Sequence, residues 1–284
     1  AVPQSWAAAA PMGLAALEPP VPPAAAGRPV RVACVGDSIT AGLWASAPQM
    51  SYPGQLQRLL GPGYTVLNFG EAGATLTRSR ASNMSYWESP HFGASLASNP
   101  DIVIIVLGTN DAAGVIWCRK YAEFVPVYAE LIRTYASLKS SPRIYIAEPP
   151  PLYSGSTYAS FFLPGVINSV YPALLPQIAC APVVQVQRSF LEHCPLGAGP
   201  AACDWIVADG IHPDDVGYGV IAAAVMEAIL RTPAGPLPGA DRTACLQSAE
   251  AIAGTQGRQE AAGSRFCAGP GAVAAGGPLV AFRG

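Results

Sequence analysis

The hydrophobic residues of this chain form short continuous runs, and segments with apolar residues at helical spacing lie between them. The runs are typical of strands buried on both faces of a parallel sheet. Strands joined through intervening helices pair in parallel by right-handed crossovers. The pattern therefore predicts an α/β protein, a three-layer α/β/α sandwich with a five-stranded parallel sheet. The expected strands are 30–35, 64–68, 100–107, 143–147 and 183–186, and the expected helices are 52–60, 121–139, 165–180 and 214–230.

The composition changes at both ends of this alternating region. Residues 1–29 are rich in Ala and Pro and lack the basic start and compact apolar segment of a signal peptide, so we expect a linker or the start of a mature chain. From residue 232 onward Gly, Ala and Pro dominate and periodicity disappears. We therefore expect one catalytic domain at 30–231 and, at 232–284, an extension that packs on it.

Charge and motif content exclude several classes of function. Only 12% of the residues are charged and the formal net charge is -2, with no basic stripe of the kind that nucleic acid requires. The longest strongly apolar run, 102–107, is too short to cross a bilayer. No cluster of His, Cys or Asp has the spacing of a catalytic metal site, and no cofactor motif is present. We expect no metal, no cofactor, no nucleic acid partner and no transmembrane segment.

The chain has seven cysteines, which are many for a cytosolic enzyme. Cys194 and Cys203 lie in one predicted loop, while Cys245 and Cys267 bracket the tail, and we expect both pairs to form disulfides in a secreted protein. Cys34, inside the first strand, is expected to be a buried free thiol. The alternative is that all seven cysteines are reduced and scattered through loops and core.

Polar residues follow the predicted strands, and the serine after the first strand is a candidate nucleophile. Ser38 lies in Gly36-Asp37-Ser38, where the first strand ends and the chain turns. Open α/β folds place their ligands at this edge of the sheet. The alternative is a plain turn in which Asp37 or Ser38 caps the next element; even with Ser38 as nucleophile, we expect Asp37 to shape the turn.

A serine nucleophile needs a base, and the chain has three histidines. His91 has no carboxylate at a suggestive spacing, and His193 has only the adjacent Glu192. His212 follows Asp209 by three residues in one tight loop, so that the carboxylate can orient the imidazole. We expect His212 to be the base and Asp209 its orienting carboxylate, although a loop histidine is often only a surface or capping residue.

Two further loops at strand ends offer donors for an oxyanion. The backbone N–H of Gly73 and the side-chain amide of Asn110 follow the second and third strands, and the N–H of Ser38 is a third donor. Taken singly, Gly73 and Asn110 could be turn residues. Their placement together with Ser38 and His212 favours an oxyanion hole.

Four motifs in this order resemble the blocks of the SGNH, or GDSL, hydrolases over about residues 30 to 231. They are Gly36-Asp37-Ser38-Ile39-Thr40, Asn68-Phe69-Gly70-Glu71-Ala72-Gly73-Ala74-Thr75, Gly108-Thr109-Asn110-Asp111 and Asp209-Gly210-Ile211-His212-Pro213. The resemblance implies a flavodoxin-like sandwich, the SGNH hydrolase fold, and the same roles for Ser38, Gly73, Asn110, Asp209 and His212. Gly70 is a less suitable occupant of the glycine position, because Gly73 precedes the small residue and the Thr of its block.

Within that family the segments around Asn68 and Pro149-Pro150-Pro151 look most like the carbohydrate O-acetylesterases. The resemblance thus implies a serine esterase that removes short acyl groups, acetyl above all, from a small-molecule or glycan ester. The alternatives are a lipase or thioesterase for longer acyl chains and a non-enzymatic extracellular module. Four aromatic residues in predicted loops could form a sugar platform or could simply be packing: Trp44, Tyr52, Trp87 and Tyr153.

Overall fold

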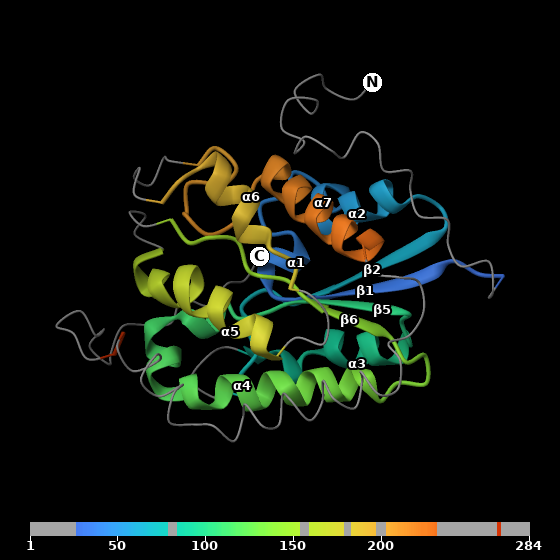
Figure 1. The fold of residues 1–284 in the computed structure, drawn as a ribbon, viewed down its shortest axis with the longest axis horizontal. Coiled ribbons are helices and arrows are strands. Elements are labelled where there is room, and N and C mark those ends of the chain that lie inside the picture. The colour runs from blue at the N-terminus through green and yellow to red at the C-terminus, as the bar shows by residue number, and fades with distance from the viewer. Residues whose placement is uncertain are drawn as a thin grey trace.

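The computed structural model describes residues 27–78, 84–153, 159–178, 183–196, 203–231 and 266–267. Its main sheet has four parallel strands in the order β2-β1-β5-β6 (Figure 1). The strands are β1 (Val30–Gly36), β2 (Tyr64–Gly70), β5 (Ile102–Val106) and β6 (Arg143–Ile146). The prediction of an α/β fold around a parallel sheet is confirmed. A second, two-stranded parallel sheet joins β3 (Ala74–Thr75) to β4 (Met84–Ser85).

The expected fifth strand at 183–186 is present only as a single parallel bridge between Ala147 and Val184. The N–H of Val184 donates to Ile146 and the N–H of Glu148 donates to Val184. Helix α6 (Val186–His193) begins two residues later, so the ladder ends there. The apolar residues at 183–186 therefore form one β-bridge and the start of α6. This helix was not predicted from the sequence.

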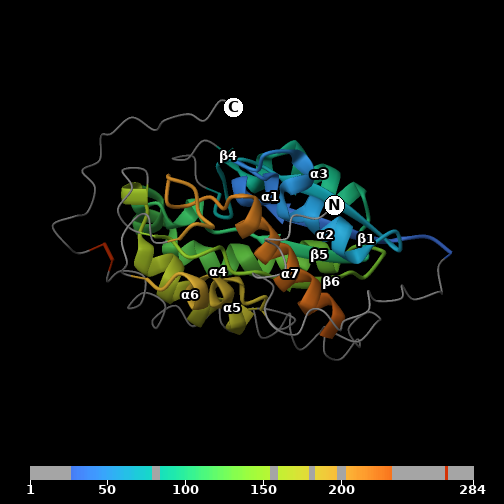
Figure 2. The same cartoon turned by 90° about the horizontal axis from the view of Figure 1, so that it is seen from above.

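Helices lie on both faces of the sheet (Figure 1), and the view from above in Figure 2 shows α7 lying over it. Alternate strand residues serve two separate cores, one on each face. Ile102, Ile104 and Val106 pack with residues of α2 (Tyr52–Leu60), α6 and α7 (Asp215–Arg231). Val103 and Ile105 pack with residues of α4 (Gly114–Ala136) and α5 (Tyr171–Ile178), and α3 (Pro90–Ala97) contacts β2. Because both faces are covered, the central strand is apolar throughout.

Two predicted helices differ from the observed ones at their starts. Helix α4 begins at Gly114, seven residues before the expected start, and no side chain caps it at Ala113. The segment expected as a helix at 165–180 begins with a wider turn at Val166–Val170 and continues as α5. Helix α3 and the one-turn helix α1 (Ser38–Ala41) were not predicted. The remaining elements are short turns of 3₁₀ helix, at Pro48–Met50, Tyr86–Glu88, Asn110–Ala112 and Ala159–Phe161.

One expected disulfide is confirmed and the other is wrong. Cys194 and Cys203 are bonded, with 5.1 Å between their Cα atoms. Cys267 is bonded to Cys118 of α4, and not to Cys245, which lies outside the described residues. A contact between residues 149 positions apart leaves no local signal in the sequence, which is why spacing within the tail suggested the wrong partner. Cys34 is free and fully buried, as predicted.

No helix in the described part of the chain is long and apolar enough to cross a membrane. The expected linker and tail extension fall almost wholly outside the described residues, apart from 27–29 and 266–267. All strands of the main sheet run towards the left in Figure 1. The loops that follow β1, β2 and β5 therefore meet at one edge, and the loop before α7 joins them there.

Candidate active site

Ser38 is the first residue of α1, directly after the end of β1. Asp37 caps this one-turn helix, because its Oδ1 atom accepts a hydrogen bond of 3.0 Å from the N–H of Ile39. The prediction that Asp37 shapes the turn is thus confirmed. The sharp change of direction leaves the side chain of Ser38 at the carboxyl edge of the sheet. Close packing of α1 against β2 explains Gly70, because a Cβ atom there would lie 2.0 Å from the backbone nitrogen of Ala41.

Asp209 and His212 form a pair within one loop. The Nδ1 atom of His212 lies 2.6 Å from Oδ2 of Asp209. The other carboxylate oxygen accepts the backbone N–H groups of Ile211 and His212, at 2.8 and 2.9 Å. Burial raises the pKa of the Asp209 carboxyl, but its hydrogen bonds from His212 and the charge of that residue outweigh burial and leave the pKa below its ordinary value. The carboxylate therefore stays ionised and fixes one side of the ring.

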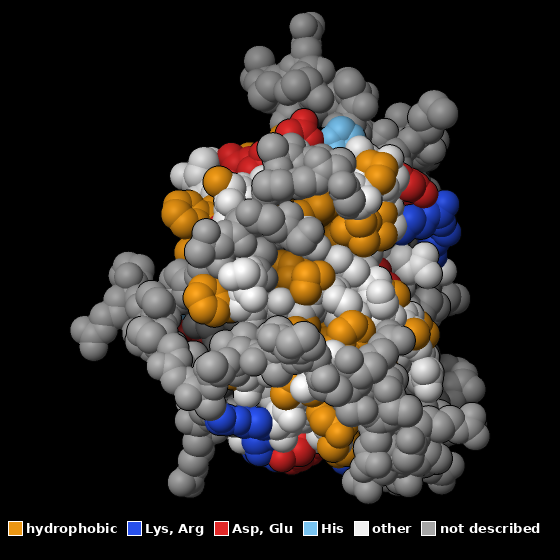
Figure 3. All heavy atoms as spheres, turned by 90° about the vertical axis from the view of Figure 1, so that its left-hand side faces the viewer, with side chains coloured by type: hydrophobic (Ala, Val, Ile, Leu, Met, Phe, Trp, Pro, Cys, Tyr) orange, Lys and Arg blue, Asp and Glu red, His pale blue; other side chains and the backbone are white. Residues whose placement is uncertain are grey.

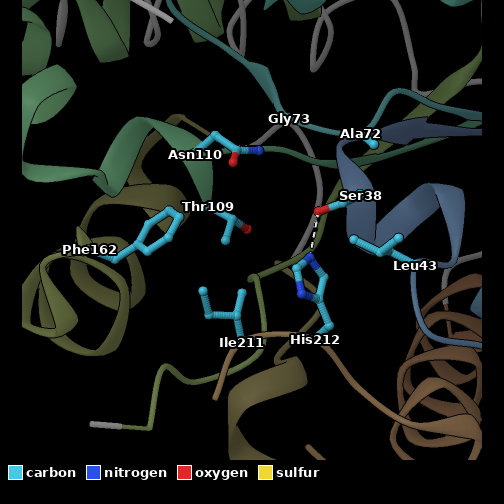
Figure 4. Close-up of a pocket in the computed structure, with 9 residues that line it drawn as sticks. All are labelled: Ser38, Leu43, Ala72, Gly73, Thr109, Asn110, Phe162, Ile211 and His212. Atoms are coloured by element: carbon cyan, nitrogen blue, oxygen red, sulfur yellow. Dashed lines mark hydrogen bonds between the residues drawn. The ribbon is translucent and has the colours of Figure 1, made fainter. Parts of the chain in front are cut away.

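The other side of the ring faces Ser38. The Oγ atom of Ser38 and the Nε2 atom of His212 are 2.8 Å apart, although the residues are separated by 174 positions in the chain (Figure 4). Both side chains are buried, with exposed fractions of 6% and 4%. The arrangement Ser38–His212–Asp209 has the geometry in which an imidazole takes a proton from a hydroxyl.

Gly73 and Asn110 lie on the far side of Ser38 from His212 (Figure 4). Gly73 has φ of +80°, a conformation that favours glycine, while the space around its Cα is open. The side-chain amide of Asn110 donates to the carbonyl of Ala74 at 3.0 Å, which joins the two loops. An amide group has two N–H bonds, so the second can point into the pocket.

Ser38, Gly73, Asn110 and His212 line a small pocket. It has about 330 Å³ of empty space, part of it open to solvent. Five residues that the sequence analysis did not single out complete its lining: Leu43, Ala72, Thr109, Phe162 and Ile211. Four of them are direct chain neighbours of predicted site residues or lie in the same motifs. Phe162 had no such signal, because it reaches the pocket from a segment far along the chain. The pocket is mainly apolar, with polar groups gathered around Ser38.

A second carboxylate, Asp111, holds the loop that carries Gly73. Its oxygens accept the N–H groups of Leu76 and Thr77, at 2.7 and 2.8 Å, and the hydroxyl of Thr77 at 2.7 Å. Asp111 is 1% exposed, and burial raises the pKa of its carboxyl against the opposing effect of these hydrogen bonds. Asp111 therefore fixes Leu76 and Thr77, which follow Gly73 closely in the chain, and the sequence analysis gave it no role although it follows Asn110 directly.

Asp37 is the other buried carboxyl near Ser38. Burial raises the pKa of Asp37 to about 6, while the N–H of Ile39 and the charge of His212 act in the opposite direction. Its Oδ2 atom is buried and has no donor at hydrogen-bond distance among the described residues, although the side chain of Thr109 is near enough to lower the pKa. Asp37 thus accepts fewer hydrogen bonds than Asp111.

The four aromatic candidates for a sugar platform have different surroundings. Tyr52 is fully buried, and its hydroxyl contacts Thr40 Oγ1 at 3.2 Å. Tyr153 is 3% exposed and donates to the carbonyl of Cys194. Neither ring can offer a face to a sugar, so for these two the expectation of a platform is wrong and packing is the correct explanation.

Trp87 and Trp44 are the two remaining candidates. The indole N–H of Trp87 donates to Leu76, and the guanidinium of Arg78 lies 4.0 Å from the ring centroid, so this ring is already covered. Trp44 is 62% exposed, has φ of 69°, and follows the pocket residue Leu43. A positive φ at a tryptophan is uncommon, and here it accompanies an exposed side chain directly after a pocket residue.

Neither of the other two histidines lines the pocket, and the Nε2 atom of His91 lies 3.9 Å from a carboxylate oxygen of Glu71. His193 stacks on Trp205 and contacts Asp204, with 2.8 Å from its Nε2 atom to the carboxylate. In the described part of the chain, one group has the spacing of metal ligands. It consists of His193, Cys194 and Asp204. Because the sulfur of Cys194 is bonded to Cys203, it cannot act as a thiolate ligand.

The chain is similar in sequence to known proteins. The model of the GDSL-like lipase/acylhydrolase family matches residues 34–220. An acetylxylan esterase of Xylanibacter ruminicola is 29% identical over 218 residues, which are 70% of this chain and 43% of the relative. The chain thus spans less than half the length of this curated relative.

Two solved structures are similar in fold. An aryl esterase of M. smegmatis superposes with a TM-score of 0.54 at 21% identity. A carbohydrate acetylesterase of Sinorhizobium meliloti superposes with a TM-score of 0.51 at 22% identity. Each superposition covers 71% of this chain and 98% of the other. At these identities the likeness shows the α/β fold.

Proposed function

The chain belongs to the GDSL-like lipase/acylhydrolase family, and on that premise we propose that it is a serine esterase that removes acetyl groups from a carbohydrate. The observation that carries this proposal is the contact of Ser38 Oγ with His212 Nε2 at 2.8 Å, with Asp209 on the other ring nitrogen. Ser38 is the proposed nucleophile, His212 the base and Asp209 its orienting carboxylate.

In the first half-reaction, Ser38 Oγ attacks the ester carbonyl carbon and His212 Nε2 takes the hydroxyl proton. The protonated imidazole is stabilised by the Asp209 carboxylate. The tetrahedral intermediate then collapses, the bond to the alcohol oxygen breaks, and His212 gives its proton to that oxygen. The sugar leaves as an alcohol, and Ser38 carries the acyl group.

In the second half-reaction, a water takes the place of the sugar. His212 removes a proton from the water, whose oxygen attacks the acyl carbon, and the proton then returns to Ser38 Oγ as the carboxylic acid leaves. The negative charge that develops on the carbonyl oxygen in both halves needs preorganised donors. We assign this role to the N–H groups of Ser38 and Gly73 and to the side-chain amide of Asn110.

A carbohydrate ester is supported by two observations. The acetylxylan esterase relative is named for such a substrate. On the face at the carboxyl ends of the strands, the described atoms near the centre are orange hydrophobic side chains and white groups, and the acidic and basic side chains lie towards the margins (Figure 3). An uncharged surface with an exposed ring suits a neutral sugar, so we assign Trp44 to substrate binding.

We place the catalytic unit at residues 30–231 and describe its helices and sheet as a three-layer α/β/α sandwich. The pairs Cys194–Cys203 and Cys118–Cys267 favour an oxidising compartment, which supports secretion. The reaction as written requires no cofactor.

The test uses the purified chain with acetylated xylan and measures released acetate. We expect acetate release by the wild type and none above background for Ser38→Ala, with the same thermal midpoint for both. Nitrophenyl esters of increasing acyl length are the second arm. A rate maximum at eight carbons or more would replace the acetyl specificity with that of a lipase or thioesterase. No hydrolysis of any ester and no labelling of Ser38 by an organophosphate would favour a binding module instead.

A further inference from the structure

One wall of the pocket is built by a segment that the four motifs do not include. Phe162 lines the pocket and lies on the opposite side from Ser38 and Leu43 (Figure 4). Phe161, its neighbour, is 53% exposed and is not part of the lining. Adjacent aromatic residues thus have opposite surroundings, and only the second ring borders the reacting atoms.

The backbone at Phe162 is attached to the segment that follows Asn110. Phe162 forms an antiparallel bridge with Ala113, and the N–H of Leu163 donates to the carbonyl of Ala112 at 2.9 Å. The chain from Asn110 to Ala113 leads directly into α4. The distance between this wall and the Asn110 amide is therefore set by backbone hydrogen bonds rather than by side-chain packing alone.

A segment of the tail lies against the same wall. The ring of Phe266 packs on the backbone of Gly165, where a Cβ atom would lie 2.1 Å from Phe266 Cε1. The next residue, Cys267, is bonded to Cys118 in the first turns of α4. Phe162, Leu163, Phe266 and Cys267 all pack against the same hydrophobic core. The segment at 162–165 thus lies next to the start of α4 on one side and a disulfide-anchored ring on another.

The direction of the acyl group follows from the tetrahedral geometry at the reacting carbon. In the view of Figure 4, Ser38 lies to the right, Gly73 and Asn110 above and His212 below. The bond to Ser38 therefore points to the right, and the oxyanion points up towards Gly73 and Asn110. The leaving oxygen points down, because it must receive its proton from His212. The fourth substituent, the acyl chain, is left to point towards Thr109 and Phe162.

The geometry points to Phe162 as the residue that limits the length of the acyl group, with Phe266 and the Cys118–Cys267 disulfide as the clamp that keeps it in place. This inference rests on the proposed esterase function and adds a specificity determinant to it. An acetyl group ends before the ring, whereas each further methylene would have to displace it. Displacement is opposed by the backbone bridge to Ala113 and by the packing of Phe266 on Gly165.

The experiment measures kcat/KM of the full chain for nitrophenyl acetate, butanoate and octanoate. Phe162→Ala should raise the ratio of butanoate to acetate by about tenfold or more, since one or two methylenes in an apolar pocket change the rate by about this much. Phe162→Leu should raise it less. Phe266→Ala and the double variant Cys118→Ser/Cys267→Ser should raise it about threefold, because the wall stays but moves more easily.

Phe161→Ala is the matched control and should leave the ratio unchanged, since that ring is outside the pocket. Thermal melts of every variant establish that the compared proteins are folded. An unchanged ratio in both Phe162 variants would overturn the inference while leaving the esterase function standing. An unchanged ratio in the Phe266 and cysteine variants alone would overturn the clamp. Absence of hydrolysis in the wild type would instead overturn the proposed function.

Discussion

The base side of the site is built within one short loop, whereas the oxyanion side joins segments that are 34 to 36 residues apart in the chain. Asp209 orients His212 and also accepts two backbone N–H groups of its own loop. On the oxyanion side, Asn110 donates to Ala74, and Asp111 accepts from Leu76 and Thr77. In the proposed mechanism, the local arrangement carries the proton transfer and the long-range arrangement sets the position of the oxyanion donors. Variants on the two sides should therefore differ in kind as well as in size.

The largest effect is expected for His212→Ala. Loss of the base should lower kcat for acetyl esters by about 10⁶-fold, because members of such a triad act as a unit. The loop should keep its shape, since Asp209 still accepts the backbone N–H groups of residues 211 and 212. His193→Ala, in an exposed pair with Asp204, is the control and should retain full activity. Full activity in His212→Ala would contradict this role.

A smaller loss is expected for Asn110→Ala, about 10²–10³-fold in kcat, the range found when one oxyanion donor is removed. This variant also removes the hydrogen bond to Ala74, so the loop at 72–75 loses one of its attachments. Steady-state kinetics with nitrophenyl acetate give the value. A loss below tenfold would mean that Asn110 only joins the two loops and contributes no donor.

Asp111→Asn separates positioning from chemistry. The amide can accept through only one atom, so at least one of the three donors from Leu76 and Thr77 loses its partner. We expect a fall in kcat of about tenfold with KM nearly unchanged, corresponding to about 1.4 kcal/mol of transition-state stabilisation. Thr77→Val, which removes the hydroxyl and leaves both backbone donors, should have a weaker effect in the same direction. If Asp111→Asn alters thermal stability alone, the carboxylate has no part in placing Gly73.

The smallest effect concerns stability and involves Asp37, which lies between the two sides. Its pKa is raised from 3.8 to about 6 by burial, so the folded state keeps a proton that the unfolded state has released. The contribution of Asp37 to stability is therefore greatest below about pH 4 and is lost as the pH rises through 6. Asp37→Asn keeps the cap on Ile39 and has no charge to bury. Its melting temperature relative to wild type should rise by at least about 2 °C between pH 4 and pH 8. A difference that does not change with pH would contradict this.

Local sequence features predicted the contact between Asp209 and His212, and the reasons are physical. Asp209 and His212 are three residues apart, and a tight loop leaves few ways to arrange them. The ends of β1, β2 and β5 were visible as apolar runs followed by glycine and polar residues, so the edge that gathers Ser38, Gly73 and Asn110 could be inferred. What each donor is bound to could not, because Ala74, Leu76 and Thr77 meet Asn110 and Asp111 only in the folded chain.

The misses have the same origin. Val184 looked like part of a strand because apolar residues at a strand end and at the start of α6 form one run. Tyr52 was a candidate for the sugar platform, but at the start of α2 its ring is buried and its hydroxyl contacts Thr40 of α1. The partner of Cys267 and the origin of the pocket wall at Phe162 both depend on contacts across the fold. Spacing along the chain carries no information about such contacts.

The central claim is that Ser38 is a nucleophile activated by His212. The most direct measurement is labelling by an organophosphate, followed by intact-protein and peptide mass spectrometry. We expect one adduct per chain, located on Ser38, with matching loss of esterase activity. The adduct should be absent from Ser38→Ala and should form far more slowly in His212→Ala. Labelling at another residue, or full ester hydrolysis by Ser38→Ala, would contradict the account.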